Sequence, residues 1–367
     1  MIRIGFFTGW RCEYGLTFEL LKVIDSSPDF DLLIYPNGLH FLEKYGYTIS
    51  EIKNDGFRIG EEIHTYSENG DEKVFELTNS INMTYKVLKR ANLDGVLVNG
   101  DRIEAYATAL AAHFMKLPVF HIGGGVITEG AVDNIYRYNI TNLSSVSFVT
   151  TQRAFNRLKN LEIIDKNNVH LVGSTAIDRI ISFRDNPELP CRFVEGLKNK
   201  DYCLMTFHPV TNKSEPIGEL MDWSIKMVSS KGYDIVITYP NNDEGCESIL
   251  EVIEDWKSYH NIHVKKNLGS RGYYAAINES KFVIGNSSSG VIEAPYFNKP
   301  VLNIGSRQEG RDKDTGIVDV EPNIDSLNKA LEMGFQEGWV SKECHYLYGD
   351  GSSSEKIKNV IKKYFTL

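Results

Sequence analysis

The chain has 367 residues, more than one hydrophobic core usually organises, so its length predicts two domains of ordinary size. Its 42% of apolar and 24% of charged residues are typical of a soluble globular protein and exclude a disordered, collagen-like or coiled-coil chain. Forty basic residues against forty-nine acidic ones give a net charge of −9, which argues against nucleic acid or an anionic membrane as a partner.

Neither a membrane span nor a disulfide framework is indicated. No apolar run approaches the roughly 20 residues of a membrane helix, and the opening residues lack a secretory peptide's apolar stretch, so a cytoplasmic protein is expected. The five cysteines are odd in number, scattered and without a CxxC pair, which indicates neither disulfides nor a zinc knuckle.

The first half of the chain alternates short apolar runs with amphipathic stretches. The apolar runs predict strands at residues 2–7, 31–36, 94–101, 117–125, 145–151 and 169–174. The stretches with helical spacing predict helices at residues 16–26, 72–92, 104–116 and 151–161. Strands that alternate with helices predict a parallel sheet with right-handed crossovers.

The same pattern restarts in the second half. Strands are predicted at residues 201–209, 234–240, 281–290 and 299–305, and helices at residues 217–230 and 247–259. We expect the domain boundary near residues 174–200, where a polar segment carries two prolines. The fold class is therefore α/β with two units.

The polar motifs follow the predicted strands. Ligands of open parallel sheets bind beyond the carboxyl ends of the strands. Such loops are expected at residues 8–14, 99–104, 121–133, 206–211, 286–293 and 305–311.

The clearest phosphate candidate is GNSSSGVIEAP at residues 285–295, where hydroxyl donors and a glycine meet at a predicted strand-to-helix turn. Its candidate phosphate ligands are Ser287, Ser288, Ser289 and Gly290. A serine N-cap followed by a tight turn explains the same segment equally well. Glu293 is a candidate to accept hydrogen bonds from a ribose diol, or it is only a partner of the helix dipole.

Three arginines follow predicted strands and are candidates to bind the same anion. Arg11 lies in GWRCEYG, and Arg307 and Arg311 lie in GSRQEGR. Guanidinium groups match phosphate oxygens, although any single arginine is more often a surface residue or an ion-pair partner.

The candidates for acid–base chemistry are Asp101, Glu129, Asp133 and His208. Asp101 and Asp133 are equally well placed as helix N-caps, and a histidine at a strand end is usually structural. Glu129 and Asp133 share a face only if their segment is helical, and Gly130 between them favours a loop as much.

The sequence disfavours hydride-transfer enzymes and serine hydrolases, and it does not indicate a metal site. The glycines after His121 do not follow GxGxxG, and the serines do not follow GxSxG, which disfavours hydride transfer and serine hydrolysis. The DKD at residues 312–314 is more typical of a solvated loop than of a metal site.

Taken in order, the motifs resemble the UDP-N-acetylglucosamine 2-epimerase family, particularly its hydrolysing branch. The resemblance runs from residue 1 to about residue 320 and is carried by GWRCEYG, NGLH, NDGF, NGDRIEAYATALAA, LPVFHIGGG, TEGAVDNIYRYNIT, TFHPVT, GNSSSGVIEAP and NIGSRQEGR. It implies two Rossmann-like domains facing across a nucleotide-sugar cleft, as in glycosyltransferase-B-type folds. The expected parts are residues 1–174 with the catalytic side, residues 175–348 with the UDP side, and a terminal helix within 349–367 that returns to the first domain.

The resemblance also implies an activity. Hydrolysing members convert a UDP-N-acetylhexosamine into UDP and the free 2-epimer for sialic-acid-like biosynthesis. They remove the C2 proton, expel UDP to form a glycal and add water, with no redox cofactor. A homodimer or dimer-based tetramer is expected, with a UDP-sugar as the only other partner.

Several roles carry over where the motifs match. Asp101 and Asp133 resemble acid–base residues, and Arg137 occupies the family's arginine position after the acidic pair. Glu293 resembles the ribose-binding carboxylate. Residues expected around the diphosphate are Arg11, His208, Ser288, Ser289 and Arg311.

The chain departs from the family pattern where proton-transfer groups are expected. In the segment after His121 the family commonly carries one or two carboxylates, and this chain has Gly123 and Val126. Two further departures are Tyr138, where the family has histidine, and Asn134, where it has Asp or Glu. The nucleotide half of the site is retained, and part of the chemical half is altered.

Three hypotheses follow. The favoured one is an active hydrolysing epimerase in which Asp101, Asp133 and Glu129 transfer protons. The second is another UDP-sugar enzyme on the same fold, such as a glycosyltransferase or a UDP-sugar hydrolase. The third is a protein that binds a UDP-sugar without turning it over.

Overall fold

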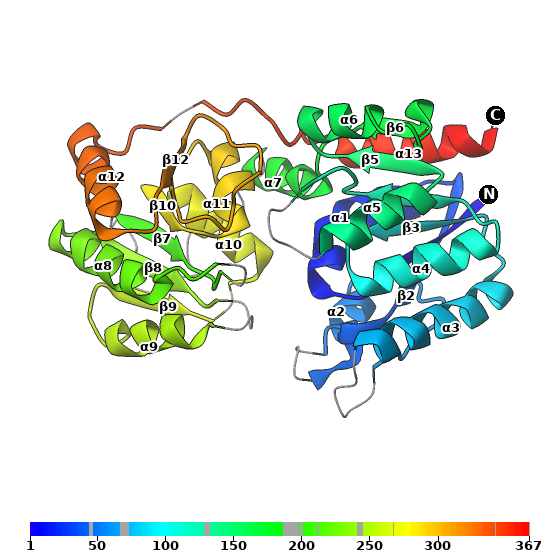
Figure 1. Cartoon of the computed structure of the whole chain (residues 1–367), viewed down its shortest axis with the longest axis horizontal. Helices are drawn as coiled ribbons and strands as arrows, with labels where there is room; N and C mark the ends of the chain where they lie inside the picture. The colour runs from blue at the N-terminus through cyan, green and yellow to red at the C-terminus, as the bar shows by residue number, and fades with distance from the viewer. Residues whose placement is uncertain are drawn as a thin grey trace. The chain divides into compact units, whose positions relative to one another are not determined.

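The structure is a computed structural model that describes residues 1–43, 47–66, 73–127, 133–185, 197, 201–210, 213–240, 245–266, 268–341 and 343–366. The chain forms two compact units (Figure 1). The first holds the described residues up to Arg179 and those from Tyr348 onward, and the second holds the described residues from Ile180 to Leu347. Among the described residues, no helix has both the length and the apolar content that crossing a bilayer requires.

The first unit is built on a parallel sheet of six strands in the order β2-β1-β3-β4-β5-β6. Its strands are β1 (Ile2–Thr8), β2 (Phe30–Pro36), β3 (Gly95–Asn99), β4 (Val119–Ile122), β5 (Val146–Val149) and β6 (Val169–Leu171). Its helices are α1 (Arg11–Asp25), η1 (Gly38–Phe41), α2 (Ile49–Asn54), α3 (Lys73–Ala91), α4 (Ile103–Phe114), α5 (Asp133–Leu143), α6 (Gln152–Lys159), η3 (Lys166–Asn168), α7 (Thr175–Asp185) and α13 (Ser353–Thr366). The chain passes into the second unit within α7.

Alternation along the strands of the first unit buries both faces of the sheet, because successive side chains of a strand point to opposite sides. Phe6 packs in a cluster with α1 and α13, and its neighbour Phe7 packs in another cluster with α3, α4 and α5. Near-continuous apolar strands are typical of parallel sheets covered by helices on both faces. Helix α13 contributes Ile357 and Ile361 to the first of these clusters.

The second unit repeats this plan with the strand order β12-β11-β10-β7-β8-β9. Its strands are β7 (Tyr202–Thr206), β8 (Asp234–Thr238), β9 (Ile262–Lys265), β10 (Phe282–Gly285), β11 (Val301–Ile304) and β12 (Ile317–Val320). Its helices are α8 (Ile217–Ser230), α9 (Glu247–Trp256), α10 (Gly269–Glu279), α11 (Ser288–Ile292), η4 (Ala294–Phe297) and α12 (Ile324–Glu337).

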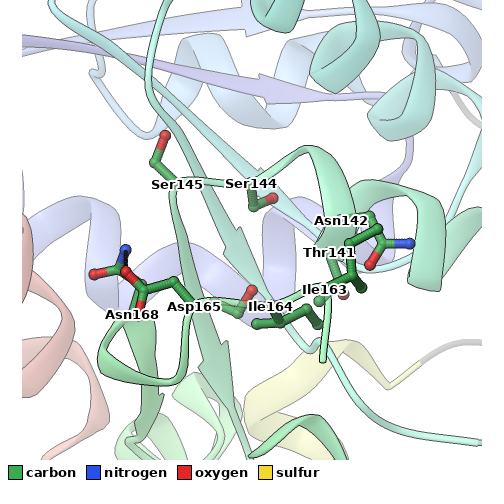
Figure 2. Close-up of a pocket in the computed structure, with 9 residues that line it drawn as sticks. Thr141, Asn142, Ser144, Ser145, Ile163, Ile164, Asp165 and Asn168 are labelled. Carbon is green, nitrogen blue, oxygen red and sulfur yellow. Dashed lines mark hydrogen bonds between the residues drawn. The ribbon is translucent and has the colours of Figure 1, made fainter. Parts of the chain in front are cut away.

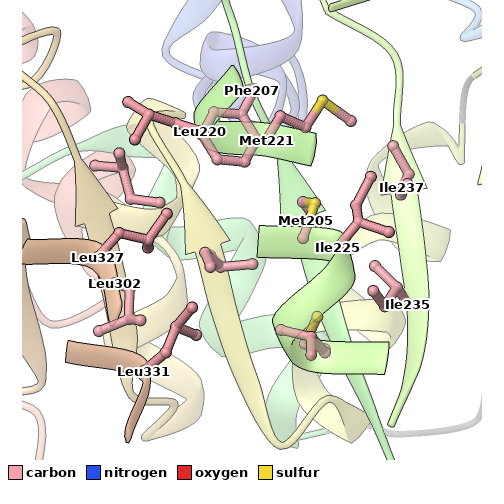
Figure 3. Close-up of a cluster of buried hydrophobic side chains, with 14 of the residues drawn as sticks. Met205, Phe207, Leu220, Met221, Ile225, Ile235, Ile237, Leu302, Leu327 and Leu331 are labelled. Carbon is pink, nitrogen blue, oxygen red and sulfur yellow. The ribbon is translucent and has the colours of Figure 1, made fainter. Parts of the chain in front are cut away.

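One large apolar cluster lies between this sheet and helices α8, α9 and α12. Figure 3 shows part of it, with Met205 and Ile237 from the strands facing Leu220 and Ile225 of α8. The two parallel sheets and their helices confirm the predicted fold class of two Rossmann-like α/β units.

Each sheet has one topological switch point, where the strand order reverses. In the first unit β1 lies between β2 and β3, and in the second unit β7 lies between β8 and β10. Loops leave in opposite directions at such a point, and ligands of open α/β sheets bind there beyond the carboxyl ends of the strands. The loops after β1 and β3, and those after β7 and β10, are therefore the places to look for a site.

Candidate functional site

Asp101 and Arg137 form an ion pair at the switch point of the first unit. Asp101 lies in the loop between β3 and α4, and Arg137 projects from α5. Arg137 donates through Nη2 to Asp101 Oδ2, and through Nη1 to the carbonyl oxygen of Val126 at 2.8 Å and to Asn134 Oδ1 at 3.0 Å. The side chain of Arg137 is 10% exposed and that of Asp101 is 22% exposed. Asp101 is therefore a fixed carboxylate that still reaches the surface.

His121 supports this pair from inside the unit. Its fully buried ring contacts the carbonyl oxygen of Gly100 through Nε2 at 2.8 Å and Thr141 Oγ1 through Nδ1 at 3.1 Å. Burial lowers the pKa of His121, the bond to Gly100 raises it and the charge of Arg137 lowers it, and together they bring it to about 4. The ring is neutral at pH 7, and its Nε2 carries the proton because a carbonyl oxygen can only accept.

Asp133 and Arg11 lie at helix starts in the first unit. Asp133 is the exposed first residue of α5, four residues before Arg137, so the two share a helix face. Arg11 is the exposed first residue of α1, directly after the loop that follows β1. Glu129 lies outside the described residues.

The departures at Gly123 and Val126 have different structural consequences. Val126 and Tyr138 both pack against one apolar cluster that contains Leu158, so the two departures share an apolar environment. Gly123 has a φ of +88°, and a Cβ built on it would meet nothing closer than 3.9 Å, at Asn99 Oδ1. The position of Gly123 is therefore open space beside β3, whereas Val126 belongs to the packing of the unit.

Two carboxyl groups that the sequence analysis did not single out are buried at the same switch point. Glu13 in the first turn of α1 and Glu104 in the first turn of α4 are 6% and 2% exposed. Arg102 lies beside them and donates through Nε to Glu104 Oε2 at 3.3 Å. Acidic residues are ordinary in a first helical turn, so the sequence pattern gave no sign that these two are buried.

At the switch point of the second unit, Asn286 joins the loops after β7, β10 and β11. Its Oδ1 accepts from the backbone N–H of His208 at 2.7 Å, and its Nδ2 donates to the carbonyl oxygen of His208 at 2.8 Å. The carbonyl oxygen of Asn286 accepts from Arg307 Nη1 at 3.3 Å and from Gln308 Nε2 at 2.9 Å. His208 and Arg307 are thus brought together through Asn286, which is fully buried and was not singled out from the sequence.

The serine turn follows β10 directly. Ser287 caps α11 and accepts from the backbone N–H of Ser289 at 3.4 Å, and Ser288 is the first helical residue. Ser289 Oγ donates to Glu293 Oε2 at 2.7 Å, and burial raises the pKa of Glu293 while this bond lowers it. Gly290 is buried beneath the turn. The turn and the carboxylate therefore form one connected group.

Tyr273 of α10 also belongs to this group, although no sequence motif marks it as a site residue. Its hydroxyl hydrogen-bonds Ser289, Thr206 and Ser287. Burial raises the pKa of Tyr273, and the nearby charge of Glu293 raises it further. Tyr273 is therefore part of the hydrogen-bonded group around the serine turn.

Arg311 is half-buried in the loop after β11. Its backbone N–H donates to the carbonyl oxygen of Gln308 at 3.4 Å, which places it in the same turn as Arg307. Because β11 pairs with β10, this turn and the serine turn leave the same edge of the sheet. The second unit therefore offers hydroxyl and guanidinium donors at one edge, the donor set that a diphosphate requires.

The pocket in Figure 2 is separate from these loops. It has a volume of about 120 Å³ and is lined by residues that include Ser144, Ser145, Asp165 and Asn168. These residues precede β5 and β6, so the pocket lies at the amino ends of the strands. No group of three His, Cys, Asp or Glu side chains in the described ranges is arranged to hold a metal ion.

A family model described as UDP-N-acetylglucosamine 2-epimerase matches residues 22–362. The chain belongs to this family. The UDP-N,N'-diacetylbacillosamine 2-epimerase (hydrolyzing) of Legionella pneumophila is 32% identical to it over 99% of this chain and 96% of that protein. The GDP/UDP-N,N'-diacetylbacillosamine 2-epimerase (hydrolyzing) of Campylobacter jejuni is 31% identical over 88% of this chain and 84% of that protein. These relatives confirm the predicted resemblance to the hydrolysing branch of the family.

The fold is shared with solved structures of the family. The UDP-GlcNAc 2-epimerase of Neisseria meningitidis, solved with UDP-GlcNAc, superposes on this chain with a TM-score of 0.82 at 18% identity, covering 99% of this chain and 100% of that one. The S. aureus MnaA–UDP co-structure gives a TM-score of 0.82 at 21% identity, covering 100% of this chain and 98% of that one.

Proposed function

We propose that this family member is a hydrolysing 2-epimerase that converts UDP-N-acetylglucosamine or a UDP-diacetamido sugar into UDP and the free 2-epimer. The observation that carries the proposal is the ion pair of Asp101 with Arg137 at the switch point of the first unit. The hydrolysing relatives at 32% and 31% identity support it.

The proposal assigns proton transfer to the first unit. Asp101, held as a carboxylate by Arg137, removes the proton from C2 of the sugar. The electron pair of the C2–H bond forms the C1–C2 double bond, and the C1–O bond breaks with UDP leaving as the diphosphate. Water then adds its oxygen to C1 and a proton returns to C2 on the opposite face. Asp133 on the face of α5 that carries Arg137 is the candidate for the second proton transfer, with Glu129 as the other candidate.

UDP recognition is assigned to the second unit. The donors proposed for the diphosphate are the backbone and side chains of Ser287, Ser288, Ser289 and Gly290, with Arg307, Arg311 and His208. Glu293 is proposed to accept hydrogen bonds from the ribose hydroxyls. Arg11, at the start of α1, is proposed to add positive charge for the same anion.

The packing of Val126 favours a second candidate function. A family position for a carboxylate is occupied by a side chain that belongs to an apolar cluster, so a protein that binds the UDP-sugar without epimerising it is the second candidate. Turnover and binding must therefore be measured together.

Proton NMR of the purified protein with UDP-N-acetylglucosamine in D₂O tests the proposal. Release of UDP and free N-acetylmannosamine with deuterium at C2 is the expected result, and the diacetamido UDP-sugar is the second substrate to test. UDP-N-acetylmannosamine as product would show the non-hydrolysing reaction. N-acetylglucosamine with its C2 proton retained would show simple hydrolysis, and UDP binding without turnover of either sugar would support the binding protein.

A further inference from the structure

Glu104 is the meeting point of three loops at the switch point of the first unit. Its Oε1 accepts from Tyr66 Oη at 2.8 Å, and its Oε2 accepts from Arg102 Nε at 3.3 Å. Tyr66 follows β2 in the chain, and Arg102 follows β3. The buried carboxylate of Glu104 therefore accepts from a tyrosine that lies 38 residues earlier in the sequence.

Two glycines let the loops close on Glu104. A Cβ built on Gly9, after β1, would lie 2.7 Å from Glu104 Cβ, and one on Gly38, after β2, would lie 2.8 Å from Glu104 Oε1. Both distances are shorter than any real Cβ contact, so any other residue at either place would displace Glu104 or the loop. Gly38 also has a φ of +57°, which disfavours other residues. The loops after β1, β2 and β3 are thus shaped around this side chain.

A second buried carboxyl group, Glu13, belongs to the same cluster. Its Oε2 accepts from the backbone N–H of Gly9 at 2.8 Å, whereas its Oε1 is buried and receives no hydrogen bond from the described residues. An isolated buried carboxylate oxygen is costly, and a protonated carboxyl lowers that cost. Burial and the charge of Glu104, opposed by the charge of Arg102, together raise the pKa of Glu13 to about 8.

The charges of the cluster balance only if one carboxyl is protonated. The charged groups that act on Glu13 are Glu104, Arg102 and Asp101, and Asp101 has Arg137 as its own partner. Among the residues that the structure describes, Arg102 is therefore the cation that Glu13 and Glu104 share, and its guanidinium lies 5.4 Å from the ring centroid of Trp10. Glu104 holds the bond to Arg102, so Glu13 is the group that takes the proton.

We propose that Glu104 is a positioning residue that fixes Arg102, and with it the adjoining Asp101, and that Glu13 is a neutral reserve carboxyl that becomes the counter-ion of Arg102 when Glu104 is removed. Arg102 directly follows Asp101 in the chain, and Arg137 forms the ion pair with Asp101. The turnover part of the test rests on the proposed function, and the spectroscopic part does not.

Difference infrared spectroscopy tests the reserve carboxyl without any substrate. At pH 7 the wild-type protein should show a protonated-carboxyl stretching band that disappears in Glu13→Gln. The same band should disappear in Glu104→Gln, because Glu13 ionises to balance Arg102. Glu19→Gln on α1, whose partner is the surface Lys22, is the control that should leave the band in place. A band that persists in Glu104→Gln, or that is missing from the wild-type protein, would overturn the proposal.

A double-mutant cycle tests the positioning role. Glu104→Gln should lower kcat about tenfold, and Glu104→Gln with Glu13→Gln should lower it about tenfold more than the product of the two single effects, because Arg102 then has no counter-ion. Circular dichroism and thermal unfolding confirm that each variant is folded. Effects that simply multiply in folded variants would overturn the reserve role. If the wild-type protein turns over neither UDP-sugar, the proposed function fails, and the infrared result still decides the charge state of the cluster.

Discussion

The imidazole of His121 donates from Nε2 to the carbonyl oxygen of Gly100 across 2.8 Å. Gly100 immediately precedes Asp101, and on its other side the ring contacts Thr141, whose Oγ1 also bonds the carbonyl oxygen of Arg137 at 2.9 Å. One buried ring therefore supports both members of the Asp101–Arg137 ion pair through their backbones. The hydroxyl of Thr141 carries a single proton, which it donates to the carbonyl oxygen of Arg137, so this network does not depend on an accepting Nδ1.

The complete burial of His121 predicts how stability depends on pH. His121 has a folded pKa of about 4 against 6.5 in the unfolded chain, so the unfolded state binds more protons between these values. The free energy of unfolding is therefore expected to fall as pH drops from 6.5 to 4, by about 3 kcal/mol for this one group. His40, also fully buried with a pKa of about 4, adds to the same slope.

Urea unfolding of His121→Phe at several pH values checks the prediction. The variant should be less stable at pH 7 and should lose part of the slope below pH 6.5. His113→Phe, at an exposed histidine of α4, is the matched control and should keep the wild-type slope. An unchanged slope in His121→Phe would show that the ring takes up its proton without unfolding.

Asp101→Asn should reduce turnover by about 10² to 10⁴-fold, because asparagine keeps the shape and an acceptor for Arg137 but cannot take the C2 proton. UDP affinity should remain nearly unchanged, since UDP recognition is assigned to the second unit. Steady-state kinetics and calorimetric titration with UDP measure the two quantities. Asp25→Asn at the exposed end of α1 is the control. Near-normal turnover in Asp101→Asn would remove this carboxylate from the mechanism.

Arg311→Ala should weaken UDP binding by about 1.5–3 kcal/mol, the range for a hydrogen bond to a charged group. Thermal stability should change little, since Arg311 lies in a loop and is only half-buried. Lys329→Ala on α12 removes one exposed positive charge and is the control for the general electrostatic effect. A dissociation constant equal to that of the control would place Arg311 outside the site.

Gly285→Ala should destabilise the second unit by more than about 2 kcal/mol. A Cβ at Gly285 would lie 1.9 Å from the carbonyl oxygen of Thr206 on the neighbouring strand, and the φ of +136° is one that alanine rarely adopts. Gly15→Ala is the matched control, because nothing lies within 4 Å of its Cβ and α1 gains about 0.5–1 kcal/mol from alanine. Equal melting temperatures for the two variants would contradict the close contact between β7 and β10.

Local pattern was sufficient for most of the fold. The strands that pair in the centre of each sheet were predicted from their apolar runs, since a strand buried on both faces has a composition that loops lack. The edge strands β9 and β12 were not predicted, because they are only partly buried and their residues are less apolar. Their strand state is decided by pairing with β8 and β11.

For the site, the sequence by itself determined which loops carry polar groups, because those groups directly follow apolar strands. The family motifs in these loops identified Asp101, Arg137 and the serine turn as candidate site residues. Only the tertiary structure decided the partners. It paired Asp101 with Arg137, buried Glu13 and Glu104 around one arginine, and made Asn286 the link between three loops. The hydrogen-bond partners of Asn286, for example, lie from 21 to 78 positions away in the sequence. No local periodicity encodes contacts over such separations. They arise because parallel strands that are distant in the chain end at the same edge of one sheet.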